Sequence, residues 1–228
     1  MVDGRLTGAK TRVLNGQSSD LLLCVARRDS GALGVALIPR DLAGVEVEAK
    51  RAMDLHGYAN VSFNGINEAH IEWLEGDSVD EGITKAIDQA TIVLAAEMIG
   101  SAREVLERTV EYLGEREQFD VKLGSFQALQ HRCAQMFCEL ELAESAVSAA
   151  LTGLDQNAAN IGLLCSAAKA LANDCFTLIS SEAVQLHGGM GVTEEMDIGL
   201  FLKRSRVCNQ LLGSSSYHRD RFARLNEF

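Results

Sequence analysis

The feature that most constrains this chain is a change, near residue 78, in the spacing of its apolar residues. Before that point, apolar residues form short runs separated by turn residues; after it, they recur every three or four positions over long stretches. Apolar residues at that spacing lie on one face of a helix, and the single proline, Pro39, precedes the change. The sequence therefore predicts a β-domain at residues 1–77 followed by a helical domain at residues 78–228.

The first stretch is predicted to be β-structure. It contains short apolar runs and one segment in which valine or alanine alternates with a charged residue, the pattern of a half-buried strand. Strands are therefore expected at residues 21–26, 33–38, 45–49 and 60–64, with turns at 15–16, 29–31 and 39–41.

The second part is predicted to be an antiparallel bundle of four helices. Ser78 and Glu81 have the spacing of a capping box, which predicts the start of the first helix. Apolar stripes predict helices at residues 92–113, 126–150 and 161–178, and a last helical stretch at 194–225 that can break at Gly213. Long helices with one apolar stripe and short connections are typical of a four-helix bundle. The expected fold class is therefore α+β, a partial antiparallel β-domain followed by this bundle.

The composition disfavours several classes of protein. Lys and Arg number 21 against 32 Asp and Glu, and the resulting formal net charge of −11 argues against nucleic acid or anionic lipid as a main partner. No run of about 18 apolar residues occurs, and residues 1–8 contain no apolar segment, so neither a membrane span nor a signal peptide is expected. The six cysteines form no Cys-x-x-Cys pair. We expect them to be reduced core residues of a cytoplasmic protein, with no metal site.

Two segments are candidates for function: residues 116–131 and residues 183–195. Taken by itself, the pair Gly188 and Gly189 predicts a helix end, because glycine adopts positive φ, and Gly191 allows a backbone or a ligand to approach closely. Thr193 is then expected to cap the next helix. A tight turn between helices is enough to explain this pattern, since Gly-Gly-x-Gly alone is a weak signal of phosphate binding.

The polar residues of the first segment also have a purely structural explanation. Arg116 lies between two predicted helices and is by default a solvated charge. Gln127 and Gln130 are by default surface or capping residues. Neither segment alone therefore establishes a binding site.

Together, however, the two segments resemble the acyl-CoA dehydrogenase family. The family's R-x-Q-F-G…F-Q motif corresponds to residues 116–119 with residues 126–127. Its Q-x-x-G-G-x-G-x-x-x-E motif corresponds to residues 185–195, in the same order and at matching separation. Residues 8–21 resemble the strand of the family that contains G-x-K, N-G and A-D-L. The resemblance covers essentially the whole chain, and these motifs are specific.

The resemblance implies a flavoprotein that acts on acyl-CoA thioesters. In the family, FAD binds across a subunit interface, which implies a homo- or hetero-oligomer, an acyl-CoA substrate and an electron-transfer partner. Arg116 matches the arginine that reaches the pyrophosphate of the neighbour's FAD, a role that suits a guanidinium group. His187 is expected to contribute through its backbone and not its imidazole. The cofactor-binding residues implied by the resemblance are Arg116, Gln118, Phe119, Gln127, Gln185, Leu186, His187, Gly188 and Gly189.

The catalytic base of the family has no counterpart in this chain. The chemistry needs a carboxylate to remove the α-proton of the thioester while the flavin takes the β-hydride. Most members carry this Glu near the start of the last helix, at the position of Gly213; others carry it on the first helix of the bundle, at the position of Ala90. Asp88 lies two residues earlier, which on a helix turns its side chain to another face. No catalytic residue is therefore assigned. Three further positions depart from the family pattern: Leu14, Thr91 and Asp120.

The resemblance also implies that two pieces of the family fold are missing. These are the N-terminal helical domain and the first β-segment, which covers the flavin ring. An expressed fragment, a misassigned start codon and a naturally short subunit would each explain this.

Three functions remain open from the sequence. The first is a FAD-dependent subunit in the α,β-desaturation of acyl-CoA thioesters, in lipid or sterol breakdown. The second is a catalytically silent subunit that completes the FAD site of a partner dehydrogenase. The lost base positions favour the second for the mechanism, whereas the overall similarity favours the first, which is our first interpretation, for the family. The third is a helical scaffold without flavin, which would take up no FAD even alongside such a partner.

Overall fold

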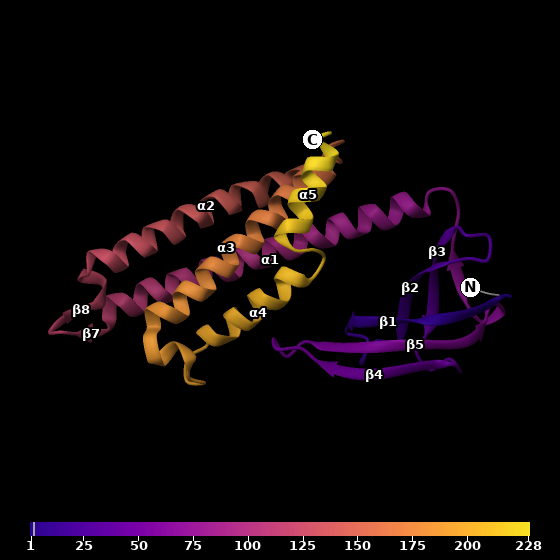
Figure 1. Ribbon diagram of the computed structural model, residues 1–228, viewed down its shortest axis with the longest axis horizontal. Coiled ribbons are helices and arrows are strands. Elements are labelled where there is room, and N and C mark those ends of the chain that lie inside the picture. The colour runs from indigo at the N-terminus through magenta and orange to yellow at the C-terminus, as the bar shows by residue number, and fades with distance from the viewer. Residues whose placement is uncertain (2) are drawn as a thin grey trace. The chain divides into compact units, whose positions relative to one another are not determined.

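The computed structural model describes Met1 and residues 3–228 of the chain (Figure 1). The chain divides into two compact units, Met1–Ala86 and Ile87–Phe228. The first helix, α1, begins at Val79, directly after the expected boundary, and the two compact units divide within this helix. Each unit is described by itself.

The first unit consists of two three-stranded antiparallel sheets. One sheet has the order β1-β5-β4 and the other the order β2-β3-β6. The strands of these sheets are β1 (Arg5–Leu14), β2 (Leu21–Arg27), β3 (Leu33–Pro39), β4 (Val45–Arg51), β5 (Gly57–Asn67) and β6 (Glu72–Leu74). A short 3₁₀ turn, η1 (Glu68–His70), precedes β6.

Alternation of side chains builds the core of this unit. Leu22 and Cys24 of β2 are buried, whereas their neighbours Leu21 and Leu23 are exposed, as the pleat of a strand requires. The inner residues of both sheets, such as Ile38, form one apolar cluster. The four expected strands are confirmed as β2 to β5. β1 was expected only from the resemblance of residues 8–21 to a strand of the family, because it is exposed at most of its positions and shows no clear alternation. β6, which has only three residues, was not predicted.

The second unit is a bundle of helices joined by short connections (Figure 1). Its helices are α1 (Val79–Glu115), α2 (Gln127–Asp155), α3 (Ile161–His187), α4 (Ile198–Gln210) and α5 (Ser215–Leu225). A small hairpin, β7 (Glu117–Gln118) and β8 (Val121–Lys122), and the 3₁₀ turn η2 (Leu123–Ser125) connect α1 to α2. A second 3₁₀ turn, η3 (Gly188–Val192), follows α3. The α+β class and the helical bundle are thus confirmed.

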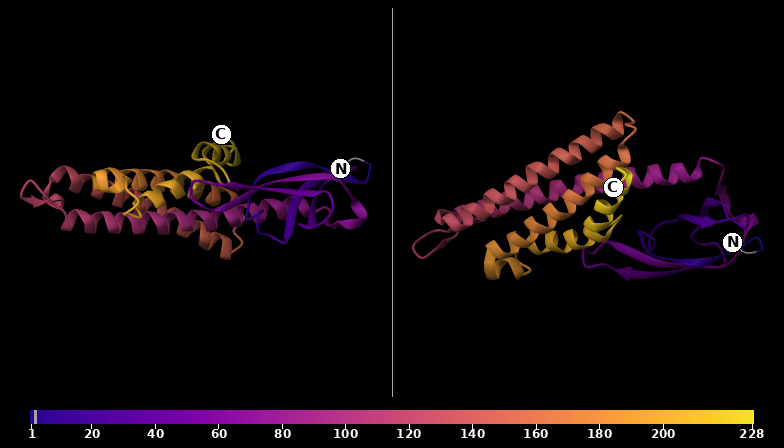
Figure 2. Two further views of the ribbon diagram at one scale, coloured as in Figure 1. Left: turned by 90° about the horizontal axis from the view of Figure 1, so that it is seen from below. Right: turned by 45° about the horizontal axis from the view of Figure 1, so that its top comes forward.

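α3 is the central helix of the bundle. It contacts α2, α4 and α5, and the further views in Figure 2 show these helices alongside it. Its buried side chains include Phe176 and Ile179, which belong to the same core cluster as Ile92 of α1 and Leu140 of α2. By length and composition alone, α3 with the following turn is apolar enough to cross a membrane, but half of its apolar stretch is buried within the bundle. Such burial is what the central helix of a packed core requires.

Two local expectations are wrong. α1 starts where the capping-box pattern placed it, but within the described chain neither the Ser78 hydroxyl nor the Glu81 carboxylate makes the capping hydrogen bonds. Thr193 does not cap the next helix: its hydroxyl donates to the Met190 carbonyl at 2.8 Å, and α4 begins only at Ile198. The break expected at Gly213 is confirmed between α4 and α5.

Candidate functional site

The first predicted segment forms a tight hairpin at the end of α1. Phe119 and Asp120 occupy its two-residue turn with φ of 57° and 63°, the backbone of the turn type that matches the twist of a hairpin. Asp120 replaces the glycine of the family motif, and aspartate is one of the few residues that adopts this conformation at low cost. The Leu123 amide donates to the Arg116 carbonyl at 2.8 Å and closes the hairpin. The departure at Asp120 is therefore compatible with the turn.

The side chains of this hairpin are presented outward. Arg116 and Gln127 are exposed, and neither side chain has a hydrogen-bond partner in the described part of the chain. Gln118 is exposed and donates only to the Glu117 carbonyl, at 2.8 Å. Phe119 is 84% exposed and contacts Phe126 edge-on, with ring centroids 6.2 Å apart. Three polar side chains and a large aromatic ring are thus available to a second molecule.

The second predicted segment forms the end of α3 and the turn η3. Gly188 follows the last helical residue with φ of 60°, as expected of a glycine that ends a helix. A Cβ atom at Gly191 would lie 2.6 Å from the Val184 carbonyl oxygen, so the expected close approach at this residue is to a backbone. At Gly188 and Gly189, by contrast, the space around the Cβ position is open. The backbone of these two glycines can therefore be reached from outside.

The residues of this segment divide into exposed and buried ones. Gln185 is exposed and its side chain has no partner among the described residues, whereas Leu186 is 5% exposed and packs in the bundle core. His187 is 3% exposed, and its Nδ1–H donates to the Ala183 carbonyl at 2.8 Å. The imidazole is thus held inside the bundle, in keeping with a contribution through the backbone.

Tyr112 brings the two predicted segments together. Its ring stacks on the His187 ring with a centroid distance of 4.2 Å and an interplanar angle of 22°. Its hydroxyl lies 3.5 Å from the His187 carbonyl oxygen, to which it donates. Tyr112 precedes Arg116 by one helical turn, so the stack places the hairpin and the η3 turn at the same end of the bundle. Sequence reasoning missed this residue, although an aromatic ring one turn before the arginine was a signal for it.

A small pocket of about 280 Å³ lies next to this stack. Arg108 is the only cation among its described lining residues and is paired with Glu104 at 2.7 Å and Asp197 at 3.3 Å. Nε2 of His187 is buried without a partner in the described chain. The pocket is lined by Arg108, Glu111, Tyr112, Glu115, His187, Glu195, Met196, Asp197 and Ile198.

The exposed part of this end fits the polar cofactor that the resemblance implies. A pyrophosphate is recognised by arginine and by backbone or amide N–H groups that are free to point at it. Arg116, Gln127 and Gln185 offer such side chains, and the open glycine pair offers backbone. Leu186 and the imidazole of His187 are buried and serve to hold this end in shape.

The two positions at which the resemblance places the family's base, Gly213 and Ala90, hold no carboxylate. Gly213 adopts φ of 111°, and a Cβ atom there would lie 2.6 Å from Cδ1 of Tyr217 and 2.8 Å from Nε2 of His218. Ala90 is exposed on α1. Asp88, as expected from its spacing, faces another side and is only 5% exposed.

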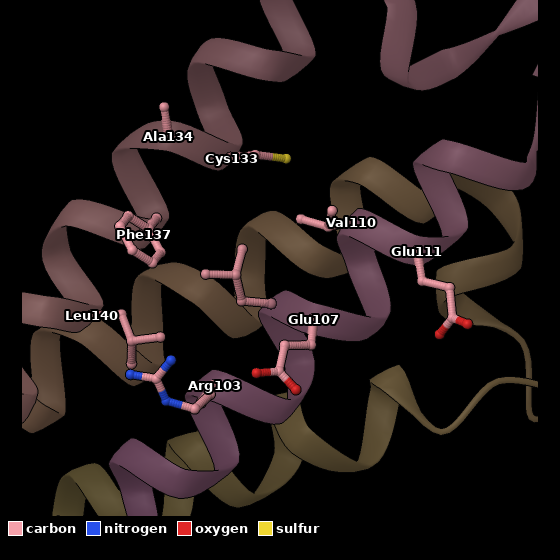
Figure 3. Close-up of a pocket in the computed structure, with 9 residues that line it drawn as sticks. Arg103, Glu107, Val110, Glu111, Cys133, Ala134, Phe137 and Leu140 are labelled. Carbon is pink, nitrogen blue, oxygen red and sulfur yellow. The ribbon is translucent and has the colours of Figure 1, made fainter.

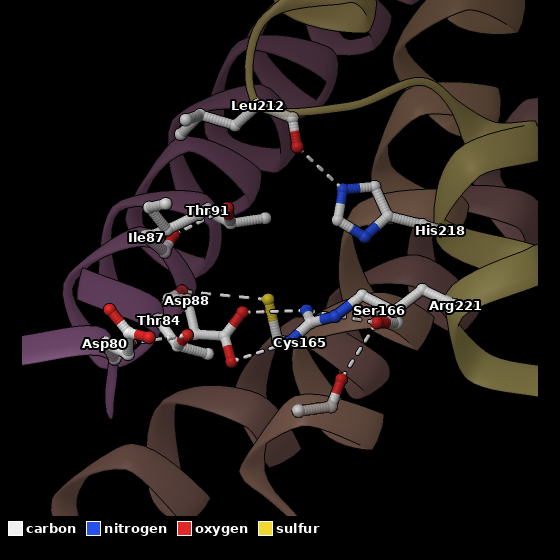
Figure 4. A network of polar contacts seen from close by, with 11 residues as sticks. Asp80, Thr84, Ile87, Asp88, Thr91, Cys165, Ser166, Leu212, His218 and Arg221 are labelled. Atoms are coloured by element: carbon white, nitrogen blue, oxygen red, sulfur yellow. Dashed lines mark hydrogen bonds and ion pairs between the residues drawn. The ribbon is translucent and has the colours of Figure 1, made fainter. Parts of the chain in front are cut away.

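Asp88 is committed to an ion pair inside the bundle (Figure 4). Its two carboxylate oxygens lie 2.7 Å and 2.8 Å from the two terminal nitrogens of Arg221 in α5. The hydrogen bond to Asp88 raises the pKa of the Arg221 guanidinium. Asp88 is therefore a structural residue and not a free base.

Two other residues depart from the family pattern, Thr91 and Leu14. Thr91 is buried, and its hydroxyl donates to the Ile87 carbonyl at 2.7 Å within α1. Leu14 is 44% exposed at the end of β1.

A groove of about 680 Å³ runs between α1 and α2 (Figure 3). Its floor is apolar, and Phe137 and Val110 are 52% and 50% exposed in it. Arg103 at one end is paired with Glu141 at 3.0 Å and with Glu144. An apolar surface of this kind on a helical unit indicates an interaction face.

Comparisons with known proteins agree with the resemblance. The family model described as "Acyl-CoA dehydrogenase, C-terminal domain" matches residues 81–225. Acyl-CoA dehydrogenase IpdE2 of Mycolicibacterium smegmatis is 37% identical over 134 residues, which cover 59% of this chain and 40% of that protein. Probable acyl-CoA dehydrogenase FadE25 of Mycobacterium tuberculosis is 26% identical over 228 residues, covering 94% of this chain and 57% of that protein.

Solved structures show the same fold. The ChsE4-ChsE5 complex of Mycobacterium tuberculosis matches with a TM-score of 0.88 and 26% identity, covering 100% of this chain and 62% of that chain. A variant of the Tcur3481-Tcur3483 steroid ACAD matches with a TM-score of 0.87 and 27% identity, covering 98% of this chain and 59% of that chain. The chain thus spans between about 40% and about 60% of the length of these proteins.

Proposed function

Because the chain belongs to the acyl-CoA dehydrogenase family, we propose that it is a subunit of a FAD-dependent acyl-CoA dehydrogenase that completes the FAD site of a partner subunit. The observation that carries this proposal is the combination of an intact set of outward-facing cofactor residues with base positions that hold no usable carboxylate. Arg116, Gln127 and Gln185 are exposed and unengaged, whereas Gly213 and Ala90 stand where the family has its glutamate. The partner then supplies the base.

The residues of this chain would bind and orient the cofactor. Arg116 would pair with the pyrophosphate, and the backbone at Gly188 and Gly189 would lie along the adenosine end. Bound FAD supplies the hydride acceptor for α,β-desaturation of the acyl-CoA thioester. Tyr112 and His187 hold the two binding segments in register. The solved relatives named as complexes or pairs, ChsE4-ChsE5 and Tcur3481-Tcur3483, support a heteromeric arrangement. The name of the steroid ACAD also supports a substrate from lipid or sterol breakdown.

A catalytically complete enzyme is the second candidate function. It is favoured by the match of residues 81–225 to the family model described as "Acyl-CoA dehydrogenase, C-terminal domain". Anaerobic bleaching of the flavin by acyl-CoA separates the two: rapid bleaching by an assembly of this chain alone would establish the complete enzyme.

The first prediction concerns FAD retention. Purified alone, the chain is expected to be nearly colourless; co-purified with a family member encoded beside it that carries the glutamate, it is expected to contribute to a yellow complex. Within that complex, Arg116→Ala is expected to weaken FAD retention roughly 10- to 100-fold, the effect of losing hydrogen bonds from a charged donor. The measurement is the flavin absorbance spectrum after dialysis at a series of free FAD concentrations.

Arg224→Ala is the matched control, because Arg224 is an exposed arginine whose only described ion pair is to Asp220 one turn away. It should leave FAD retention unchanged. A stoichiometric yellow protein from this chain alone, or equal retention by Arg116→Ala and wild type, would contradict the proposal.

The second prediction concerns association. We expect a second family subunit to cover the groove of Figure 3. Phe137→Glu places a charge on the apolar floor and is expected to weaken association at least about 30-fold, since burying an unpaired charge costs more than the apolar contact contributes. Sedimentation velocity over a wide concentration range measures it, with Leu55→Glu as control because Leu55 is 81% exposed in the first unit. A wild-type chain that stays monomeric at 24.6 kDa with and without its partner would count against association.

A further inference from the structure

Lys169 of α3 is a lysine with no exposed surface. Its exposed fraction is 0%, and it lies in the middle of the central helix between the buried residues Ala168 and Ala170. A lysine in such a place has to bury its ammonium group, which is costly unless every N–H finds an acceptor. Its position therefore calls for a specific set of partners.

Three acceptors match the three N–H groups of the ammonium. Nζ donates to Oδ1 of Asn173 at 2.7 Å, to the Cys208 carbonyl at 2.9 Å and to the Gly213 carbonyl at 3.2 Å. The Asn173 amide also donates to the Gly213 carbonyl, at 3.3 Å. The Cys208 carbonyl belongs to the last turn of α4, where carbonyls lack helical partners and a cation is favourable. Lys169 thus joins α3 to the end of α4 and to the segment that leads into α5.

That connecting segment, residues 211–214, packs Leu211 and Leu212 against the core, and the Leu211 amide donates to the Val207 carbonyl at 3.0 Å. Leu212 and Gly213 both have positive φ, at 57° and 111°, a conformation that leucine rarely adopts. On its other side, Nε2–H of His218 in α5 donates to the Leu212 carbonyl at 2.9 Å (Figure 4). Lys169, Asn173 and His218 therefore supply the side-chain hydrogen bonds that define this backbone.

Among the residues that the structure describes, Lys169 has no counter-ion. Asp88 of α1 is the buried carboxylate nearby, and Arg221 occupies both of its oxygens. The other titratable groups that face Lys169 are the thiols Cys165 of α3 and Cys208 of α4. His218 and Arg221, both of α5, add one titratable group and one cation to the same region. Burial, with only neutral acceptors, lowers the pKa of Lys169 to about 8. Burial also lowers the pKa of His218, beside Lys169 and Arg221.

We propose that Lys169 holds residues 211–214 in their position. We also propose that Lys169 and His218 take up protons when this segment is released from the bundle. When the segment is released, Lys169 and His218 reach water and bind a proton more readily than they do in place. The functional meaning of this positioning rests on the proposed function, because residue 213 stands where active relatives carry the base. The positioning of residues 211–214 by Lys169 depends on neither FAD nor a partner subunit.

The sign of the pH dependence follows from linkage. Lys169 binds a proton less readily in place (pKa about 8) than in water (10.5), so the closed segment gains stability as pH rises between these values. Below about pH 8, Lys169 is protonated in both states and contributes no further change. His218 acts in the same direction at lower pH: below its ordinary value of 6.5, acid favours the released segment.

Hydrogen exchange of the whole chain tests the inference without any cofactor. The readout is the protection of the backbone amides at residues 207–217, corrected for the intrinsic pH dependence of exchange, between pH 7 and 9.5. Lys169→Met is expected to lower this protection roughly 10- to 100-fold at pH 9.5, the effect of leaving buried acceptors unpaired. The ratio of wild-type to variant protection is expected to rise above pH 8 by up to about tenfold per pH unit, the slope for one proton.

Two further variants keep the test decisive. Lys203→Met removes an exposed lysine of α4 and should match wild type at every pH. Asn173→Ala, which removes one acceptor of Lys169 and one donor to Gly213, should lower protection of the same residues even if Lys169→Met fails to fold. Equal protection of residues 207–217 in wild type and both core variants, or a wild-type to variant ratio that does not change with pH, would overturn the inference. A failure of FAD binding would leave it standing.

Discussion

Asp88→Ala is expected to destabilise the helical unit by about 3–5 kcal/mol, because it removes the counter-ion of the Arg221 guanidinium, whose side chain is only 19% exposed. Both oxygens of Asp88 are engaged by Arg221, at 2.7 Å and 2.8 Å, and the carboxylate is 7% exposed. Urea unfolding followed by circular dichroism measures the loss. The free energy of unfolding should fall by a large part of the total that a domain of this size possesses.

Asp220→Ala is the matched control for this prediction. Asp220 pairs with Arg224 on the same helix, but both side chains are more than 60% exposed, so its loss should cost less than about 0.5 kcal/mol. The double variant Asp88→Leu with Arg221→Met should recover much of the stability, since it removes both buried charges. If Asp88→Ala and Asp220→Ala prove equally mild, the buried ion pair does not hold α5 to α1.

Gly213→Ala is expected to destabilise the chain by about 2–5 kcal/mol, from backbone strain and overpacking together. The residue has φ of 111°, and its new Cβ would lie 2.6 Å from Tyr217 and 2.8 Å from His218. Glutamate has the same Cβ, so Gly213→Glu is expected to be at least as costly. Thermal unfolding with calorimetry measures both variants.

Gly199→Ala is a control variant that is expected to raise the free energy of unfolding instead of lowering it. Gly199 lies in α4 with open space around its Cβ position, so alanine there should stabilise the helix by about 0.5–1 kcal/mol. A Gly213→Ala protein as stable as wild type would mean that residues 211–214 adapt freely, which would also weaken the assignment of Lys169.

The fold could be predicted largely because local spacing determines it. The apolar stripes of α2 and α3 and the turn glycine Gly188 are signals within a few residues of the structure they specify. The prediction that Thr193 caps the next helix was wrong because its hydroxyl donates to a local acceptor, the Met190 carbonyl. β1 carried too few buried residues for its alternation to be visible.

The site was predictable only in part, since its assembly depends on contacts between distant residues. The exposed Arg116, Gln118 and Gln127 are visible as a motif, but the stack of Tyr112 on His187 joins residues 75 positions apart. The partners of Lys169 are distributed over three segments, two of them about 40 residues away. A lysine inside an apolar stripe was the sequence signal that such partners exist.

The surroundings of Gly213 restrict which residues can arise at this position by mutation. A single base change converts two of the four glycine codons to glutamate codons, so mutation alone could place a carboxylate at this position. The side chains of Tyr217 and His218 now occupy the room that such a residue needs, and His218 is itself tied to the Leu212 carbonyl. We infer that reversion is blocked unless those two positions change first. Residue 213 is therefore expected to remain small as long as Tyr217 and His218 are present.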